Sequence, residues 1–172
     1  MKKIRKINNK ITEQELYYLA GIIDGTSSFS IHKTACGKID EISSKRAPMW
    51  TAALKISGSN PRLCKMINNL LFLGDSYVRL EPSNPTRRPG TNSRILNEIR
   101  LAGPILDEIL PKLINKLKIK KEHAELLIKF RESVSRNNDK NPLPIHIEQY
   151  RSSLQDRLKY INSQEYKNEH WE

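Results

Sequence analysis

The sequence is poor in the features that mark secreted, zinc-binding and membrane-spanning proteins. It contains only two cysteines, Cys36 and Cys64, which form neither a metal-ligand spacing nor a disulfide framework. No apolar run approaches the roughly 18 residues that a membrane helix needs. The basic segment 1–10 lacks the apolar stretch of a secretory signal. We therefore expect an intracellular protein in a reducing compartment, either a prokaryotic cytoplasm or an organelle such as a mitochondrion or chloroplast.

Acidic residues are also in short supply relative to basic ones. The 172 residues include 19 Asp and Glu against 30 Lys and Arg, which gives a formal net charge of +11. Such an excess favours a polyanionic partner, although lysine-rich surfaces are also common in proteins from AT-rich genomes. Because no segment has the pattern of a basic amphipathic membrane helix, nucleic acid is favoured over a membrane surface.

The order of helical and alternating segments predicts a single α+β body. A helix starts after Thr12, whose hydroxyl forms a capping box with Glu15, and runs over residues 16–24. Apolar and polar residues alternate over 29–33, 50–57, 76–81 and 94–101, as they do in strands. Further helices are expected from Pro61 and over 105–114, 121–136 and 145–161. Strands that follow one another in pairs predict a mainly antiparallel sheet.

The most informative segment is LAGIIDGTSSF, residues 19–29. Gly21 and Gly25 lie four residues apart and so share one helix face. Since glycine inside a helix costs about 1 kcal/mol relative to alanine, the pair indicates a close backbone approach. The alternative is that Gly25 only ends the helix and Gly21 is incidental.

This segment, with Tyr18 before it, resembles the signature of the LAGLIDADG homing endonucleases. Weaker similarity extends over 54–62, 77–79, 95–99 and 117–124. The resemblance implies an α-β-β-α-β-β-α core with a saddle-shaped antiparallel sheet, to which this chain adds a C-terminal helix. We accordingly expect a basic arm at 1–11, a nucleic-acid-binding domain at 12–136, and a linker with a helix and tail at 137–172.

A single copy of the signature implies a homodimer on a near-palindromic target. In the family the signature helix packs against its symmetry mate. The resemblance therefore predicts a dimer interface made by Leu19, Ala20, Gly21, Ile23, Asp24 and Gly25.

The chain departs from the family at the acid that binds the catalytic metal. Thr26 occupies that position, and Ser27 replaces the glycine expected next. In the family, the metal position corresponds to Thr26 and the Gly25 carbonyl of this chain. A hydroxyl is neutral and replaces a carboxylate poorly as a Mg²⁺ ligand, so we predict that no metal binds there. If the protein is an active nuclease, we expect Mg²⁺ as its cofactor. The resemblance also places Arg62 and Lys120 among the basic residues around the catalytic water.

The resemblance further implies that one face of the sheet contacts nucleic acid. Strand alternation predicts which residues face outward, and basic residues at strand ends and in loops are expected to contact phosphates. Together these predicted contacts are Ser28, Ser30, His32, Lys33, Lys38, Lys45, Arg46, Lys55, Arg79, Arg87, Arg88 and Asn97.

Three functions remain open at the level of the sequence. The first is a catalytically impaired homing-endonuclease homologue that binds DNA or structured RNA as a homodimer. The second is an active, Mg²⁺-dependent, site-specific endonuclease that makes double-strand breaks. The third is an RNA maturase or ribonucleoprotein component. The paired change at Thr26 and Ser27 fits natural drift better than an engineered knockout, which usually alters the acid alone.

Overall fold

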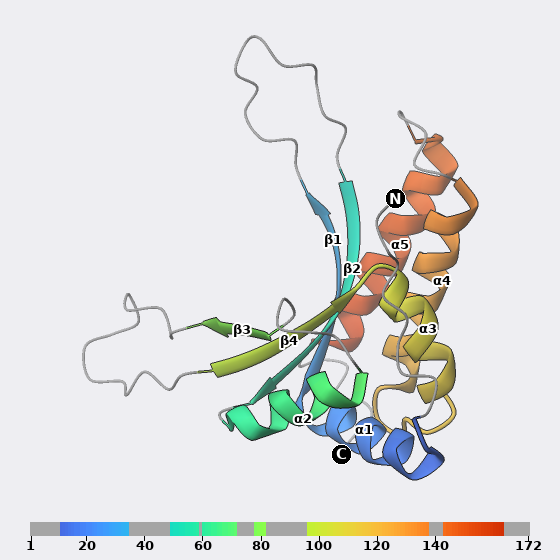
Figure 1. The fold of residues 1–172 in the computed structure, drawn as a ribbon. Helices are drawn as coiled ribbons and strands as arrows, with labels where there is room; N and C mark the ends of the chain where they lie inside the picture. Colours follow the sequence, from blue (N-terminus) through green and yellow to red (C-terminus); the bar gives the residue numbers. More distant parts are fainter. Residues whose placement is uncertain are drawn as a thin grey trace, which may run out of the picture.

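A twisted antiparallel sheet carries helices on only one of its faces (Figure 1). The computed structural model describes residues 11–34, 49–58, 60–71, 78–81, 96–137 and 143–163, so the predicted N-terminal arm lies almost wholly outside the described residues. The elements in chain order are α1 (Glu13–Thr26), β1 (Ser27–Thr34), β2 (Met49–Gly58), α2 (Pro61–Leu71), β3 (Val78–Glu81), β4 (Leu96–Ala102), α3 (Pro104–Leu113), α4 (Lys121–Asn137) and α5 (Ile145–Ile161).

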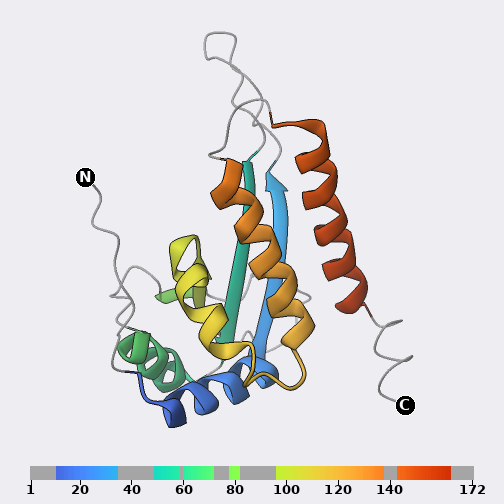
Figure 2. The same cartoon turned by 90° about the vertical axis from the view of Figure 1, so that its right-hand side faces the viewer.

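The strands are arranged in the order β1-β2-β4-β3, and every neighbouring pair is antiparallel. The helices lie below and to the right of the sheet in Figure 1, and the quarter turn of Figure 2 places α4 in front of β1 and β2, with α5 beside β1. The α+β class and the antiparallel sheet are thus confirmed. Among the described helices, none is long and apolar enough to cross a membrane.

The first helix begins as its sequence predicts and ends later than expected. Glu15 accepts the Thr12 backbone N–H at 2.8 Å, and the Thr12 hydroxyl accepts the Glu15 N–H at 3.3 Å. The Thr12 backbone N–H and the Thr12 hydroxyl both donate to the Glu15 carboxylate, and these two hydrogen bonds lower the pKa of Glu15 because they favour its charged form. At the other end α1 continues to Thr26 and passes directly into β1, two residues beyond the predicted end.

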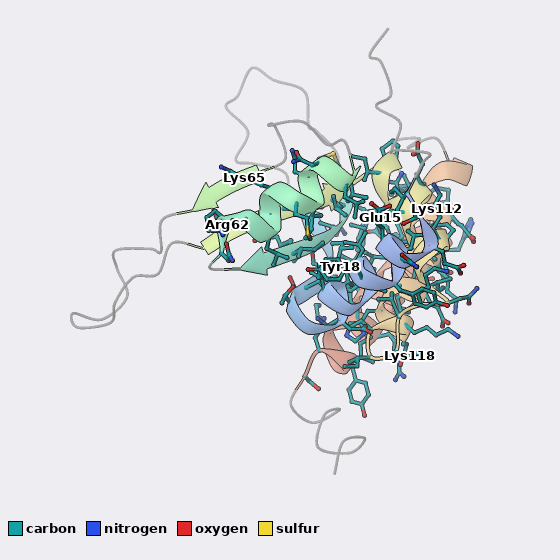
Figure 3. All side chains as sticks on the ribbon, turned by 60° about the horizontal axis from the view of Figure 1, so that its bottom comes forward. Glu15, Tyr18, Arg62, Lys65, Lys112 and Lys118 are labelled. Atoms are coloured by element: carbon teal, nitrogen blue, oxygen red, sulfur yellow. The ribbon has the colours of Figure 1, made fainter. Side chains whose placement is uncertain are left out.

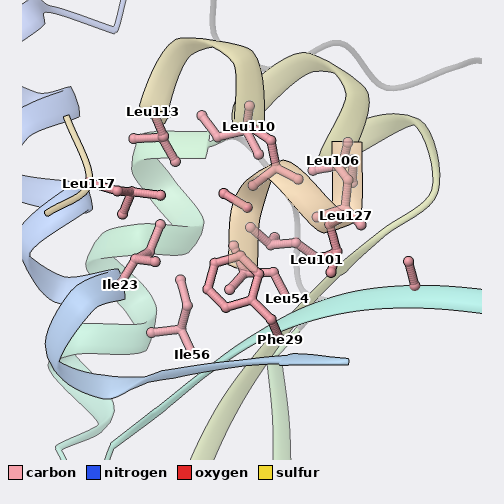
Figure 4. Close-up of a cluster of buried hydrophobic side chains, with 14 of the residues drawn as sticks. Ile23, Phe29, Leu54, Ile56, Leu101, Leu106, Leu110, Leu113, Leu117 and Leu127 are labelled. Carbon is pink, nitrogen blue, oxygen red and sulfur yellow. The ribbon is translucent and has the colours of Figure 1, made fainter. Parts of the chain in front are cut away.

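The core lies between the sheet and the helices, and strand alternation decides which strand residues enter it. Phe29, Leu54, Ile56 and Leu101 point from the strands toward α3 and α4, as Figure 4 shows. Fully burying an aliphatic or aromatic side chain of this size stabilises the fold by about 1.5–3 kcal/mol. The helices complete the core with Leu106, Ile109, Leu110, Leu113, Leu117, Ala124, Leu127 and Phe130.

The C-terminal helix α5 packs against the edge strand β1 and against α4. The Gln155 side-chain amide donates a hydrogen bond of 2.8 Å to the backbone carbonyl of Ile31. Leu154 and Leu158 are buried beside this contact. Since an edge strand exposes unpaired backbone groups that can capture another chain, α5 protects this edge of the sheet.

A buried arginine joins α5 to α4. Arg151 is 1% exposed, and its Nε donates to the Ser133 hydroxyl at 3.1 Å. One of its terminal nitrogens donates to the Ser133 carbonyl at 3.2 Å, and the guanidinium lies over the Phe130 ring. Arg151 therefore supplies both packing and hydrogen bonds at the joint between the two helices.

We expect Arg151→Ala to lower the free energy of unfolding by about 2–4 kcal/mol, because it leaves a cavity and removes the donors from buried oxygens. Urea denaturation followed by circular dichroism measures the change. The matched control is Arg157→Ala, since that guanidinium pairs with Glu122 at the surface, where its side chain is 47% exposed. The control should lose less than about 1 kcal/mol, and equal losses would contradict the assigned role of Arg151.

Candidate nucleic-acid interface

The carboxyl end of α1 is fastened to the connection between α3 and α4 by Asp24. One carboxylate oxygen accepts the backbone N–H of Lys118 and the other accepts that of Lys120, each at 2.9 Å. Because both oxygens are engaged by backbone donors, Asp24 holds segment 118–120 against α1.

The side chain of Lys120 in turn binds the end of α1. Its ammonium donates to the Ile23 carbonyl at 3.1 Å and also to the Ser27 carbonyl, both at the end of α1. The carboxyl end of a helix carries partial negative charge, so a cation is favourable there. In this position Lys120 stabilises the turn from α1 into β1.

Two hydroxyls close the last turn of α1. Thr26 donates to the Ile22 carbonyl at 2.9 Å, and Ser27 donates to the Ile23 carbonyl at 2.6 Å. The Ile23 carbonyl also accepts the Ser27 backbone N–H, so the hydroxyls add side-chain hydrogen bonds to the last turn of the helix. Thr26 is exposed, so the end of α1 presents a neutral hydroxyl to the surface.

The residues at this turn do not fit a Mg²⁺ ion. Mg²⁺ prefers carboxylate oxygens in octahedral geometry, and here the available side-chain ligand is the Thr26 hydroxyl. Both oxygens of Asp24 already accept backbone hydrogen bonds, and the Lys120 ammonium would repel a cation. Across the part of the chain that the structure describes, no cluster of three His, Cys, Asp or Glu side chains could hold a metal.

His123 of α4 lies on the helix side of the sheet, close to the turn between α1 and β1. Its ring packs on Phe29 with 5.7 Å between the centroids, and Nε2 lies 3.2 Å from the Asn162 side-chain oxygen. Burial lowers the pKa of His123, since it disfavours the charged imidazole, and the hydrogen bond to Asn162 opposes this effect. His123 is therefore a neutral packing residue at neutral pH.

The outward face of α1 differs from the predicted dimer interface. Leu19, Ala20 and Ile23 are at most 1% exposed because they pack into the chain's own core, so this part of the prediction is wrong. Gly21 and Gly25 lie on the exposed side, where a Cβ added at either would meet no atom within 4 Å.

Tyr18 shares that exposed side with the two glycines. Its side chain is 57% exposed and projects from α1 in Figure 3. Residues 18, 21, 22 and 25 follow the 3–4 residue spacing of one helix face, whereas 19, 20 and 23 form the opposite one. The glycines thus leave a shallow strip of accessible backbone beside an aromatic side chain.

The open face of the sheet carries four of the predicted contacts. Ser28 and His32 are exposed, while Ser30 and Lys55 are partly exposed. The strand register places Ser28 opposite Lys55. No described helix covers this face, because the described helices all lie on the other side of the sheet.

Lys33 does not belong to that open face. It has the same alternation phase as the buried Phe29 and Ile31. Its ammonium pairs with Glu148 of α5 and lies 5.7 Å from the centroid of the Trp50 ring. Lys33 thus contributes to the joint between β1 and α5, and its contact with phosphate stays a prediction.

Asn97 is misplaced by the sequence-based prediction. It is 3% exposed on the helix side of β4, where its amide donates to the Gly58 carbonyl at 3.4 Å. Glu98 and Arg100 occupy the open face instead. The signal was present in the sequence, since Asn97 has the same alternation phase as the apolar Ile99 and Leu101.

Arg62 lies at the start of α2 with its side chain exposed. Its backbone N–H donates to the Asn60 side-chain oxygen at 2.9 Å, which confirms Asn60 as the residue that caps this helix. Figure 3 shows Arg62 and Lys65 along α2, at the same end of the molecule as α1.

Arg79 lies opposite Glu98 in the register of β3 and β4. The following basic residues lie outside the described residues: Lys38, Lys45, Arg46, Arg87 and Arg88.

The architecture matches solved structures of homing endonucleases. The homing endonuclease I-CvuI in complex with its target aligns with a TM-score of 0.60 and 18% identity, over 86% of this chain and 82% of that one. An archaeal intron-encoded homing endonuclease complexed with DNA gives 0.59 and 15%, over 88% and 86%. The LAGLIDADG homing endonuclease I-GzeII in complex with its DNA target gives 0.57 and 16%, over 81% and 43%.

At these identities the similarity shows the fold, and it confirms the LAGLIDADG-type architecture. No protein-family model matches the sequence, and no curated protein matches it either.

We expect Asp24→Ala to lower the free energy of unfolding by about 1–3 kcal/mol, because two backbone N–H groups lose their acceptor. Asp24→Asn keeps one acceptor oxygen and should lose less. Urea denaturation in the presence of a chelator measures both, so that metal binding cannot contribute. Asp156→Ala is the control, since Asp156 pairs only locally with Lys159 at 65% exposure. A change of similar size in the control would contradict the fastening role of Asp24.

Proposed function

From a fold shared with LAGLIDADG homing endonucleases, we propose that this chain binds double-stranded DNA as a homodimer and is impaired as a nuclease. The observation that carries the proposal is the open face of the sheet, which no described helix covers and which presents polar and basic side chains. Ser28, His32, Lys55 and Arg100 are the described examples. Such donors suit both base edges in the major groove and phosphates.

The dimer is supported by the extent of the structural match and by the exposed face of α1. The match spans 82% of I-CvuI but 43% of I-GzeII, so the matched unit is less than half of the longer enzyme. Tyr18, Gly21 and Gly25 form the proposed contact with the partner subunit. Glycines allow two helices to approach closely, and burial of Tyr18 would add apolar area.

Impaired cleavage is supported by the chemistry of the turn after α1. The family's metal-binding acid is replaced by Thr26, and Asp24 is committed to backbone donors. A carboxylate beside a phosphate repels it unless a cation intervenes. Without that carboxylate, binding needs no divalent metal.

We expect the protein to select the same near-palindromic duplex from a randomised DNA pool in Mg²⁺ and in chelator, with no broken ends. Sequencing of the bound and the cleaved fractions measures both properties. A roughly tenfold or greater loss of binding in chelator would count against the proposal. Preference for one RNA fold in a parallel pool would point to a maturase or ribonucleoprotein role, and Mg²⁺-dependent breaks would show an active nuclease.

We further expect that Thr26→Glu combined with Ser27→Gly introduces Mg²⁺-dependent nicking of the selected duplex. The acid supplies a metal ligand, and the glycine gives it the family's local backbone. Thr26→Gln with Ser27→Gly is the matched control, because it has a similar shape but no charge. A native chain that already nicks as fast as the double variant would contradict impairment.

A further inference from the structure

Glu98 places a carboxylate on the open face of the sheet, next to the basic side chains of Lys55 and Arg100. Glu98 of β4 is 14% exposed, and a carboxylate oxygen lies 3.2 Å from the Lys55 ammonium of β2. Lys55 is the cross-strand neighbour of Arg100, and Glu98 is that of Arg79. On a surface proposed to bind DNA, the negative charge of Glu98 would oppose binding to phosphates, so its position suggests a different contact.

The acid restricts what Glu98 can contact on DNA. Lysine, arginine, serine and histidine side chains can donate hydrogen bonds to phosphates or to bases. A carboxylate only accepts hydrogen bonds and is repelled by phosphate. In the major groove the matching donors are the amino groups of cytosine and adenine. Lys55 offers only donors, which match the N7 and O6 acceptors of guanine.

A donor and an acceptor held side by side match the edge of one guanine–cytosine pair. We propose that Lys55 and Glu98 together recognise such a pair in each half of the target, with Lys55 on guanine and Glu98 on cytosine. This rests on the proposed function, in which the open face contacts duplex DNA.

The surroundings of the pair leave space for a base edge. The neighbouring cross-strand row consists of Ser30, Ala53 and Ala102, which all have small side chains. The Ser30 hydroxyl lies 3.4 Å from the Ala53 carbonyl and is thus directed along the sheet. On this side of Lys55 a base edge therefore meets no bulky side chain, while Arg100 and Arg79 are the cross-strand neighbours of the pair.

The test compares base preferences at every position of the selected duplex for the native protein and for Glu98→Gln. The native protein should prefer a guanine–cytosine pair by about tenfold at one position of each half-site. Glutamine adds a donor that favours adenine, so that preference should disappear in the variant while all other positions stay unchanged. Relative preferences are compared because removing a negative charge raises affinity for every duplex.

Two further variants make the outcome specific. Lys55→Met should weaken the preference at the same position, since it removes the donor to guanine. Glu125→Gln makes the same charge change on α4, on the helix side of the sheet, and should alter no position. Thermal unfolding of each variant checks that it remains folded.

Two results would overturn the assignment of Glu98 as a base contact. One is a uniform gain of affinity in Glu98→Gln with unchanged base preferences, which means that Glu98 only orients the neighbouring cations. The other is an altered position that prefers an A·T pair in the native protein. If the native protein selects no duplex at all, the proposed function fails and this inference fails with it.

Discussion

Burial of only one face of the sheet is the constraint on which the rest of the structure depends. Alternating residues of β1, β2 and β4 enter a single core with α3 and α4, and none of the described helices lies on the opposite face. Register is then tightly specified, because a shift of one residue would exchange apolar and polar sides. α5 protects the β1 edge through Gln155. The surface available to a partner is therefore a consequence of core formation.

The turn after α1 is held by contacts that run across it in both directions. The Asp24 carboxylate accepts backbone N–H groups of segment 118–120, and the Lys120 ammonium donates to the Ile23 carbonyl at the end of α1. The Thr26 hydroxyl takes no part in these contacts and bonds within its own helix. The joint between α1 and the segment before α4 therefore depends on Asp24 and Lys120.

Much of the fold could be predicted because its signals are local. The capping box of Thr12 and Glu15, the start of α2 at Pro61 and the strand alternation all depend on residues a few positions apart. The candidate site was predicted less well. Asn97 was assigned to the wrong face although Ile99 and Leu101 marked the phase of β4, and Glu98 was missed because an acid was not expected on a surface for DNA.

The sequence by itself determined the order of elements and the α+β class, since these follow from residue identity and short-range spacing. Only the tertiary structure decided that Leu19, Ala20 and Ile23 face inward, because burial depends on which layers a helix meets. It also decided the partners of Asp24, which lie 94 and 96 residues away along the chain. Contacts at that separation are made by folding and leave no spacing in the sequence from which they could be inferred.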